Sequence, residues 1–268
     1  MAVGLTSEQR QRYARHLSLA EIGVSGQQRL LRGRVLIVGV GALGSPAALY
    51  LAAAGVGIIG LADYDRLRLS NLQRQVIHSM DGLDKAKVEG AARTVRGLNP
   101  DVKVEALEVT VDEHNAMDLL GRFDVIVDGT DTFRARYLLS DAAYLLGKPL
   151  VHGSIFRVEG QVTVFIPGRG CYRCLYPEPP PPGAIEESQD AGVFAPLPGI
   201  IGTIQAAETI KLLTGTGDPL VNRVLLHDSM AMSFREVRYQ RNRACPVCGD
   251  RPTVKALIDY DAFVGAVR

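Results

Sequence analysis

The stretch V-L-I-V-G-V-G-A-L-G at residues 35–44 decides the fold of this chain. Its first four residues form an apolar run that is too short for a helix and suits a buried parallel strand. Gly39 permits the tight turn out of that strand, Gly41 lets the backbone approach a phosphate, and Gly44 allows a helix to pack closely on it. The stretch therefore predicts a strand and a glycine turn that lead into a helix whose free N–H groups face an anion.

A second strand, I-I-G-L-A at residues 58–62, runs up to Asp63. An acid at that position accepts hydrogen bonds from the hydroxyl groups of a ribose. Between the two strands we expect Ser45 to cap the helix and Pro46 to lie in its first turn. The glycine motif alone would be weak evidence, but together with the strands, helix and acid it predicts a Rossmann-type nucleotide site.

The segment after Asp63 carries more cationic and amide side chains than a redox dinucleotide site requires. S-N-L-Q-R-Q occupies residues 70–75, and Lys87 follows. The chain has no GxxxxGK[ST] motif, so the glycine turn and side chains of this kind must hold the phosphates of a nucleotide. We therefore expect the site to react ATP rather than only to hold a dinucleotide.

The composition is typical of a soluble globular protein, with 268 residues and a net charge of +1. This balance gives no reason to expect binding to nucleic acid or to a membrane. Residues 35–62 carry no charge and are long enough to span a bilayer, but glycines and a proline interrupt them as a strand–helix–strand unit requires. Charged residues precede the first apolar run, which excludes a signal peptide, and we expect a cytoplasmic protein.

Strand and helix patterns alternate along the chain, which predicts an α/β fold with a Rossmann-like, mixed but mainly parallel sheet and helices on both faces. We expect one domain over residues 1–268, with an N-terminal helical extension at 6–31 that begins at a Thr6 cap, a nucleotide-binding half at 35–153 and a second half at 154–268. Residues 177–198 begin with prolines and acids and are expected to form a mobile loop. The expected strands are 35–38, 58–62, 102–109, 125–128, 149–153, an antiparallel 161–166 and 224–227, and the expected helices are 46–55, 84–98, 112–121, 133–146 and 199–213.

The cysteines of the chain form two pairs, C-Y-R-C and C-P-V-C. Two such pairs can supply a tetrahedral tetrathiolate zinc site, and four ligands leave no open position for chemistry. Disulfides are disfavoured in a cytosolic enzyme, and a thioredoxin-like redox pair belongs at a helix start in a different context. We therefore expect a structural zinc ion that ties the end of the chain to the region after the central sheet, held by Cys171, Cys174, Cys245 and Cys248.

Taken together, these motifs resemble those of the E1-like adenylyltransferases of the ThiF/MoeB/HesA type, which activate ubiquitin-like sulfur carriers for molybdopterin, thiamine and thiolated-tRNA biosynthesis. The resemblance covers nearly the whole chain, and the order and spacing of the motifs carry it. The matching motifs are R-Y-A-R-H at 12–16, the glycine turn, D-Y-D at 63–65, S-N-L-Q-R-Q at 70–75, K-V-E at 87–89, D-G-T-D at 128–131, E-G-Q-V-T-V-F at 159–165 and both CxxC pairs.

The resemblance implies an adenylyltransferase reaction in one E1-like adenylation domain, with residues 154–268 facing the carrier. The C-terminal Gly-Gly carboxylate of a carrier attacks the α-phosphate of ATP and gives an acyl adenylate and pyrophosphate. A sulfur donor then converts the adenylate to a thiocarboxylate. No rhodanese-type domain follows the second CxxC pair, so we expect a separate donor such as a cysteine desulfurase or a rhodanese.

The resemblance also implies a role for each matching residue. Asp63 holds the ribose, Asp131 binds Mg²⁺, and Arg15 reaches the phosphates bound by the partner subunit of a homodimer. Arg, Lys and Mg²⁺ stabilise the negative charge on the α-phosphate and on departing pyrophosphate, while a carboxylate nucleophile needs no base. The residues expected to face the phosphates are Asn71, Arg74, Gln75 and Lys87.

Each of these residues also has a simpler explanation. Arg74 and Lys87 could be solvated helix charges, and Arg15 could belong to an ordinary amphipathic helix. Asp131 could cap the helix that starts at 133, and Asp65 could either join the site or only shape the turn after the second strand. The five histidines form no ligand pair and are expected to be structural.

The chain departs from the family pattern in its loop. S-Q-D-A-G-V at 188–193 stands where many family members carry C-A-E-A-G-V. The hydroxyl of Ser188 cannot form the acyl disulfide or the exchangeable thioester that a thiol forms. This puts a covalent enzyme–carrier intermediate in question and leaves adenylation unaffected. Thr132 stands where the family often has Asn, a milder change.

Three other functions are compatible with parts of the sequence. An NAD-dependent dehydrogenase would share the glycine motif and Asp63 but would not require Asn71, Arg74 and Lys87. A related E1-like enzyme could adenylate a non-protein carboxylate or a tRNA-borne group, although the cysteine pairs and the loop favour a protein carrier. A non-catalytic zinc scaffold that kept its nucleotide pocket would have no need to retain these charges.

Overall fold

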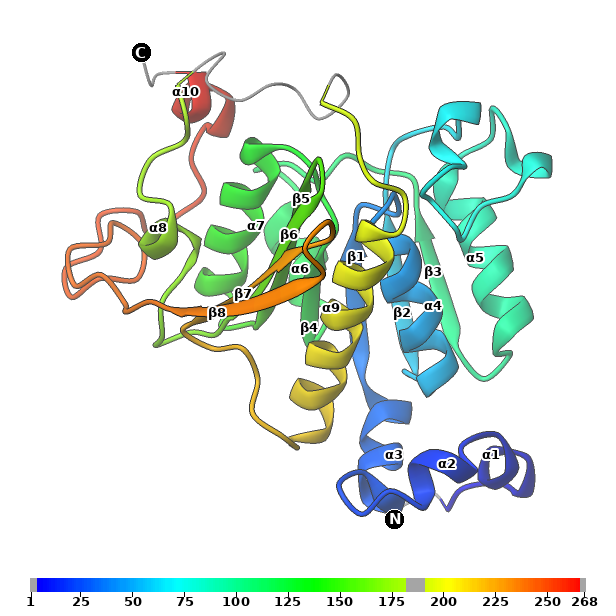
Figure 1. Ribbon diagram of the computed structural model, residues 1–268. Helices are drawn as coiled ribbons and strands as arrows, with labels where there is room; N and C mark the ends of the chain where they lie inside the picture. Colours follow the sequence, from blue (N-terminus) through cyan, green and yellow to red (C-terminus); the bar gives the residue numbers. More distant parts are fainter. Residues whose placement is uncertain (1–3, 182–190, 266–268) are drawn as a thin grey trace.

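The computed structural model describes residues 4–181 and 191–265. Within them, the strands form one eight-stranded sheet in the order β3-β2-β1-β4-β5-β6-β7-β8 (Figure 1). The strands are β1 (Arg34–Val38), β2 (Ile58–Ala62), β3 (Lys103–Leu107), β4 (Val125–Asp128), β5 (Leu150–Phe156), β6 (Glu159–Phe165), β7 (Arg223–Asp228) and β8 (Ser233–Arg238).

Strands β1 to β5 pair in parallel, so their carboxyl ends meet at one edge of the sheet. At that edge Val38 of β1 stands opposite Ala62 of β2 and Asp128 of β4. The pairs β5–β6, β6–β7 and β7–β8 are antiparallel. The predicted mixed, mainly parallel Rossmann-like sheet is therefore confirmed.

Helices cover both faces of the sheet, as predicted (Figure 1). Side chains alternate between the faces along β1, so Ile37 packs into the core on the α4 side and Leu36 into the core on the α7 side, both fully buried. Helices α4 (Gly44–Ala54), α5 (Lys87–Leu98) and α9 (Leu197–Thr214) contribute to the first core, and α6 (Ala116–Gly121) and α7 (Phe133–Leu145) to the second.

Some helix starts differ from the expectation. Ser45 does not cap α4, because its hydroxyl donates to the Gly41 carbonyl at 2.5 Å and the helix begins one residue earlier. α5 begins at Lys87 and α6 at Ala116, each later than the apolar pattern predicted. In both regions a turn occupies the residues before the helix.

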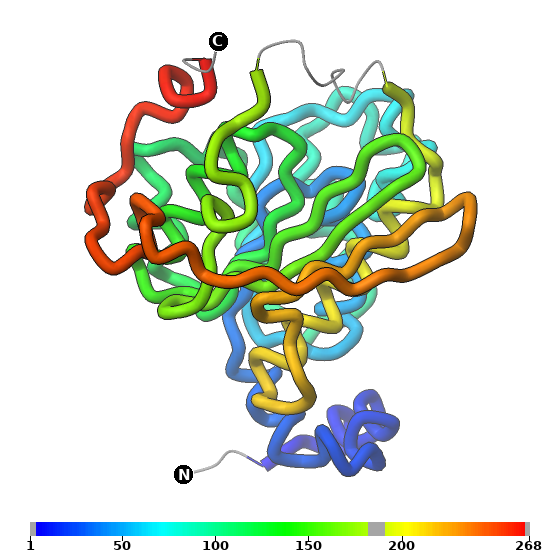
Figure 2. The backbone as a smooth tube through the Cα atoms, turned by 60° about the vertical axis from the view of Figure 1, so that its left-hand side comes forward, coloured from blue at the N-terminus to red at the C-terminus, as the bar shows by residue number. Residues whose placement is uncertain are grey.

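The N-terminal extension consists of three helices, α1 (Ser7–Arg12), α2 (Ala14–Leu17) and α3 (Gly23–Arg32). The Thr6 cap is confirmed, since the Thr6 hydroxyl accepts the Gln9 N–H at 3.1 Å and the Gln9 side chain accepts the Thr6 N–H. In Figures 1 and 2 these helices lie at the end of the molecule opposite the short C-terminal helix α10 (Tyr260–Gly265). The extension therefore lies far from the carboxyl ends of the parallel strands.

The antiparallel side of the sheet contains two elements that the sequence did not predict, the edge strand β8 and the short helix α8 (Tyr172–Leu175). All six residues of β8 are exposed, which explains the missing apolar alternation of S-F-R-E-V-R. Figure 2 shows the β7–β8 hairpin, in orange, along the outer edge of the sheet. Residues 182–190 of the expected 177–198 loop, including Ser188, lie outside the described residues. Helix α9 begins at Leu197, inside the range expected for the loop and two residues before the expected helix start.

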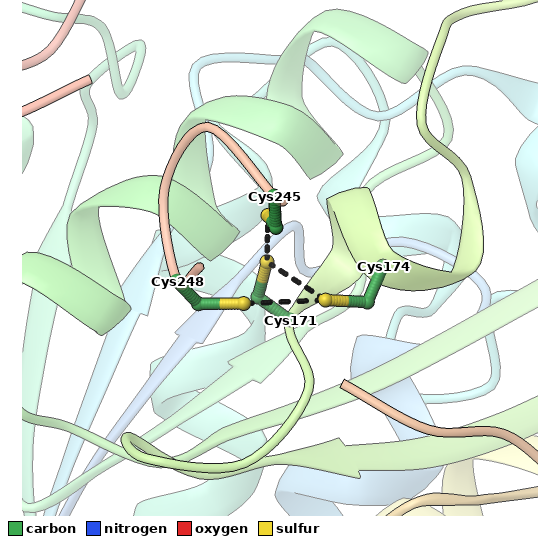
Figure 3. Close-up of side chains that lie close together, drawn as sticks. All are labelled: Cys171, Cys174, Cys245 and Cys248. Carbon is green, nitrogen blue, oxygen red and sulfur yellow. Dashed lines mark hydrogen bonds between the residues drawn. The ribbon is translucent and has the colours of Figure 1, made fainter. Parts of the chain in front are cut away.

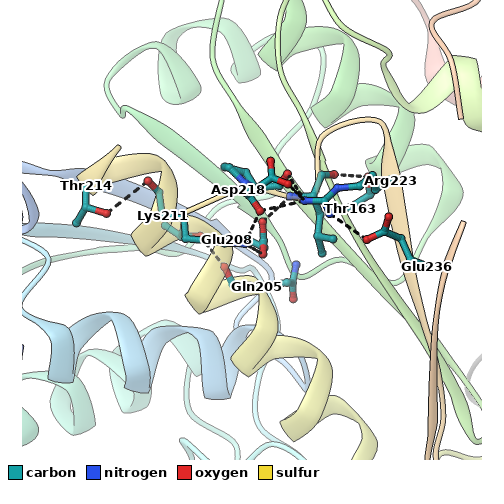
Figure 4. Close-up of polar contacts among 11 residues, drawn as sticks. Thr163, Gln205, Glu208, Lys211, Thr214, Asp218, Arg223 and Glu236 are labelled. Atoms are coloured by element: carbon teal, nitrogen blue, oxygen red, sulfur yellow. Dashed lines mark hydrogen bonds and ion pairs between the residues drawn. The ribbon is translucent and has the colours of Figure 1, made fainter. Parts of the chain in front are cut away.

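A polar network fastens α9 to the loop before β7 and to the hairpin (Figure 4). The buried carboxylate of Glu208 accepts the Leu220 N–H at 2.8 Å and pairs with Lys211. The guanidinium of Arg223 pairs with Asp218 at 2.9 Å and with Glu236 of β8 at 3.0 Å. These bonds fix the hairpin against the rest of the sheet where few apolar side chains are available.

No helix among the described residues combines the length and the apolar character needed to cross a bilayer.

Candidate functional site

A cleft of about 550 Å³ opens at the carboxyl ends of β1, β2 and β4. Its size is within the range of small-ligand pockets. In an open parallel sheet, ligands bind at this edge because loops and helix N-termini meet there. The cleft brings together eight of the residues predicted from the sequence, namely Gly39, Gly41, Asp63, Asp65, Arg74, Gln75, Lys87 and Asp131.

The glycine turn forms the floor of the cleft. Gly39 has a φ of +85°, and a Cβ there would lie 2.7 Å from the Gly129 carbonyl oxygen, so only glycine fits. A Cβ on Gly44 would collide with the Gly39 carbonyl oxygen, which explains the glycine at the start of α4. Gly41 is different, because a Cβ there would meet only the Gln75 side chain at 3.4 Å. Gly41 therefore leaves room at the open side of the turn rather than inside the packing.

Asp63 joins this turn to the end of β2. One of its carboxylate oxygens accepts the Val40 N–H at 2.8 Å, and the other accepts the Asp65 N–H at 2.8 Å. Burial raises the pKa of Asp63, and the nearby positive charge of Lys87 opposes that rise. The carboxylate is thus fixed in orientation and retains lone pairs toward the cleft.

Lys87 is not a solvated helix charge. It is the first residue of α5, its side chain is only 6% exposed, and its Nζ lies 2.7 Å from a carboxylate oxygen of Asp65. The backbone N–H of Lys87 also donates to the Asp65 carbonyl at 3.0 Å. Asp65 therefore holds a buried ammonium group at the cleft, which is more than shaping the turn.

The segment S-N-L-Q-R-Q crosses the cleft wall next to Lys87. Arg74 is half-buried and donates to the Ser70 carbonyl at 3.1 Å. Gln75 is 5% exposed, and its Oε1 atom has no hydrogen-bond partner among the described residues. Asn71 does not line the cleft; its carbonyl accepts the N–H groups of Arg74 and Gln75, and its side chain accepts the Arg68 N–H. Asn71 thus stabilises the turn that presents the other two.

Asp131 is exposed at the N-terminal end of α7 and lines the cleft. It does not cap that helix, because the cap is Thr132, whose hydroxyl accepts the Ala135 N–H at 3.3 Å. The simpler explanation of Asp131 as a cap is therefore wrong. Its carboxylate is free to bind a cation at this edge of the sheet, since carboxylate oxygens are ligands that Mg²⁺ prefers.

The loop that carries Asp131 is fixed from beneath by a buried carboxylate at the end of β4. Asp128 accepts the Thr130 N–H at 3.0 Å and the Thr130 hydroxyl at 2.6 Å, and lies 2.7 Å from Nδ1 of His152. Burial by itself would raise the pKa of Asp128, but the hydrogen bond from His152 leads the effects that lower it. Burial lowers the pKa of His152, so a neutral imidazole donates to an ionised carboxylate.

Arg15 is not part of this cleft. It lies exposed on α2, at the opposite end of the molecule, and is outside the cleft lining. The structure therefore gives Arg15 no role within the same chain.

The cleft contains charged residues that the sequence did not single out. Arg134 and Arg136 of α7 line its second wall, and Asp261 of α10 reaches it from the C-terminal end of the chain. The apolar part of the wall includes Val109, Val111, Leu138 and Leu139, which all belong to the core on the α7 side of the sheet. Only the position of Arg134 and Arg136 after the D-G-T-D motif could have indicated them.

The four cysteines form one cluster on the antiparallel side (Figure 3). Their sulfur atoms all lie within 4.8 Å of one another, with Cys171 at 3.5 Å from Cys245 and Cys174 at 3.2 Å from Cys248. Zn–S bonds of about 2.3 Å in a tetrahedron would separate the sulfur atoms by about 3.8 Å, so the spacing of the cluster fits four thiolates around one zinc ion. The pKa of Cys174 is lowered to about 6, first by its hydrogen bond with Cys171.

A buried ion pair connects this cluster to α7 and α10. Arg173, between the first two cysteines, pairs with Asp141 of α7 at 2.8 Å, and the Tyr260 hydroxyl donates to the same carboxylate at 2.9 Å. Arg173 and Asp141 are 3% and 0% exposed. The guanidinium also lies over the rings of Tyr137 and Phe263. The cluster is thus continuous with the packing around the C-terminal helix.

Comparison with known proteins agrees with this geometry. The ThiF family profile matches residues 13–247. A sulfur carrier protein adenylyltransferase of Thermus thermophilus is 47% identical over 266 residues, which cover 97% of this chain and 98% of that protein. A SAMP-activating enzyme E1 of Haloferax volcanii is 48% identical over 250 residues, 93% of each chain.

Among solved structures, E. coli MccB with MccA-N7isoASN superposes with a TM-score of 0.80 at 23% identity, over 91% of this chain and 76% of that one. This likeness shows a shared fold. Because the family profile spans most of the chain, and relatives nearly half identical to it extend over almost its whole length, the chain belongs to the ThiF family.

Proposed function

We propose that this protein uses ATP to adenylate the C-terminal Gly-Gly carboxylate of a ubiquitin-like sulfur-carrier protein, which prepares the carrier for thiocarboxylate formation. The observation that carries the proposal is the single cleft that combines a nucleotide-type glycine turn with Lys87, Arg74 and Asp131. A dehydrogenase would use the turn and Asp63 but has no need of buried cations for free phosphates. The names of the relatives from Thermus and Haloferax support the same reaction class.

In this proposal, the residues after β2 bind the nucleotide. Asp63 accepts hydrogen bonds from the ribose, while Gly41 and Gln75 leave room for a phosphate beside the turn. The carboxylate of the carrier attacks the α-phosphorus, a P–O bond to the β-phosphate breaks, and pyrophosphate leaves. Lys87 and Arg74 stabilise the charge that develops on the phosphate oxygens, because cations in a partly buried cleft act at low dielectric.

Two metal ions belong to the proposal. Asp131 would hold Mg²⁺, which neutralises phosphate charge when it is bound. The four cysteines would hold a structural zinc ion, since a site with four thiolates has no position for a reacting ligand. Reduced thiolates of this kind persist in the cytoplasm, where we place the enzyme.

We further propose a homodimer in which Arg15 acts on the partner subunit. This arginine is exposed and lies far from the cleft of its own chain, so only a second copy could bring it to a nucleotide. The sulfur would come from a separate donor such as a cysteine desulfurase or a rhodanese. We also propose that residues 1–268 work as one adenylation unit, with residues 154–268 facing the carrier.

The experiment that tests the proposed reaction is ATP–pyrophosphate exchange with a panel of ubiquitin-like carriers that end in Gly-Gly. We expect exchange with at least one intact carrier and none with the same carrier after removal of the Gly-Gly. Exchange without any carrier, or with a small carboxylic acid or tRNA alone, would assign a different acceptor of the adenylyl group. Thermal stabilisation by NAD and not by MgATP, with no exchange, would overturn the proposal.

A further inference from the structure

Arg134 and Arg136 lie two residues apart on α7 and line the same cleft. They differ in whether acidic side chains are paired with them. Arg134 pairs with Glu113 at 2.8 Å and with Asp261 at 2.9 Å. These two acids compensate its charge. Arg136 is half-buried, and no carboxylate among the described residues forms an ion pair with it. Its guanidinium lies near the Tyr172 side chain, and the guanidinium carbon lies 5.3 Å from the centre of the Phe133 ring.

The Nε atom of Arg136 is buried and lacks an acceptor within the described chain. A buried donor without a partner is unfavourable, and more so when it is charged. The charge of Arg136 also helps to lower the pKa of Asp128, but three hydrogen bonds from Thr130 and His152 already occupy that carboxylate. The cleft therefore holds a cation with no acid paired to it among the described residues and with a buried Nε that an acceptor on a ligand can satisfy.

The position of Arg136 indicates which ligand. Most of the residues that face ATP in the proposed function lie at residues 63–87, after β2, and Asp131 lies just before α7. The body of α7, which carries Arg136, contacts β4 and β5 on the other side of the cleft. In Figure 1, α7 lies beside β5 and β6, and α5 lies on the far side of the sheet. Ile155 and Val193, from the second half of the chain, also line the cleft. An anion that enters from that half reaches the α7 wall.

We propose that Arg136 binds the C-terminal carboxylate of the carrier and orients it toward the α-phosphate. This inference rests on the proposed function and specifies how the same site holds its second substrate. A guanidinium matches a carboxylate with two parallel N–H···O bonds, which fix the direction of the oxygens. It also favours the ionised carboxylate, the form that can attack phosphorus. When the acyl–phosphate bond forms, the substrate carboxylate loses its charge and its hold on Arg136 weakens.

The test compares how tightly two forms of one carrier bind to the wild-type enzyme and to the Arg136→Gln variant. The probe is the Gly-Gly carrier that supports exchange best, in its natural carboxylate form and as its C-terminal amide. Binding of each form is measured by calorimetry in the presence of a non-hydrolysable ATP analogue. For the wild-type enzyme we expect the carboxylate to bind about tenfold or more tightly than the amide. For Arg136→Gln we expect both forms to bind with similar affinity.

Two further variants keep the test specific. Arg134→Gln removes a neighbouring arginine that its own acids already compensate, and we expect it to retain the preference for the carboxylate. Arg136→Lys keeps the positive charge without the planar fork, and we expect it to retain part of the preference. Thermal unfolding of each variant verifies that the fold is intact.

An Arg136→Gln enzyme that still prefers the carboxylate as strongly as the wild type would overturn the inference. So would a variant in which only the KM for MgATP rises, because Arg136 would then be a phosphate ligand. Wild-type exchange with the same carrier separates the two levels of the argument. If exchange is present, such results refute the role of Arg136 alone, and if exchange is absent, the proposed function itself fails.

Discussion

The two sides of the sheet are stabilised in different ways. On the parallel side, β4 is buried at every residue and β1 at all but its first, and the cores on both faces are almost entirely apolar. On the antiparallel side, β8 is exposed at every residue, and the region is fixed by the cysteine cluster, the Arg173–Asp141 pair and the Arg223 network.

The difference follows from how many helices cover each side. A sheet covered on both faces can bury continuous apolar strands, whereas an edge hairpin has little apolar area to remove from water. The cysteine cluster and buried ion pairs replace that area on the antiparallel side. We therefore expect substitutions on the antiparallel side to change stability most, and substitutions around the cleft to change activity most.

The largest expected effect is loss of the zinc ion proposed for the cysteine cluster. Chelation, or the Cys248→Ser variant, should release the antiparallel side, because structural zinc contributes roughly 10–16 kcal/mol of binding free energy in small zinc domains. Hydrogen exchange should increase over residues 223–254 and remain slow over residues 34–62. The control is Ile126→Val in β4, which removes one buried methyl group and should cost only about 0.5–1.5 kcal/mol. Equal increases on both sides would contradict the comparison.

The next effect is expected from the buried ion pair. Arg173→Met leaves the Asp141 carboxylate buried without its guanidinium, which should lower the free energy of unfolding by about 3–5 kcal/mol in urea titrations. The double variant Arg173→Met, Asp141→Leu removes both charges and should recover most of that loss. If the double variant is no more stable than the single one, packing rather than charge explains the effect.

On the cleft side, the expected effect is on rate. Lys87→Met should lower kcat/KM for ATP–pyrophosphate exchange by about 10²–10³-fold, because a buried cation that faces the phosphates is lost. Its stability should change little, since the partner Asp65 is half exposed and can be solvated. Lys85→Met is the matched control, because the side chain of Lys85 is exposed and, among the described residues, hydrogen-bonds only to the Asp81 carbonyl. A similar loss of rate in both variants would refute the assignment.

The smallest effect concerns pH. Burial lowers the pKa of His152, so as pH falls the unfolded state takes up a proton at this residue before the folded state does. The contribution of His152 to the free energy of unfolding is therefore fully present above pH about 6.5. As pH falls below that value, stability should decline by up to about 1.4 kcal/mol per pH unit. Asp128, whose pKa is also lowered, contributes a loss only below its unfolded value of about 3.9. The free energy of unfolding, measured with denaturant from pH 7 to 5, should fall less steeply with pH for His152→Asn than for the wild type. Asparagine keeps a donor for Asp128 but cannot be protonated in this range.

The fold of the parallel side could be predicted because short apolar runs and turn residues in the local sequence indicate its elements. The 35–44 stretch gave a strand, a turn and a helix, and β2 and β4 have the expected bounds. β8 could not be predicted, because its residues pack on one neighbouring strand and show no apolar period. α10 was missed for a related reason, since Tyr260 is buried in the core on the α7 side and bonds to Asp141, 119 residues earlier in the chain.

The cleft was predictable to the extent that residue type determines role. Asp63 was expected from its position after a strand, and Lys87 and Asp131 were expected from the resemblance of their motifs to the family; the structure places all three in one cleft. The burial of Lys87 and the absence of an acid paired with Arg136 among the described residues were not predictable, because each depends on which side chains of distant segments reach them. The sequence shows which residues are charged, but only the folded structure shows which of them are paired with an opposite charge.

The separation of the two cysteine pairs also has a consequence during synthesis. Cys245 follows Cys171 by 74 residues. At roughly 5–20 residues per second, the ribosome needs about 4–15 s to add the second pair after the first has been made. For that time the first pair of thiols has no partner from the second, so the four-sulfur cluster can assemble only after most of the chain has been made.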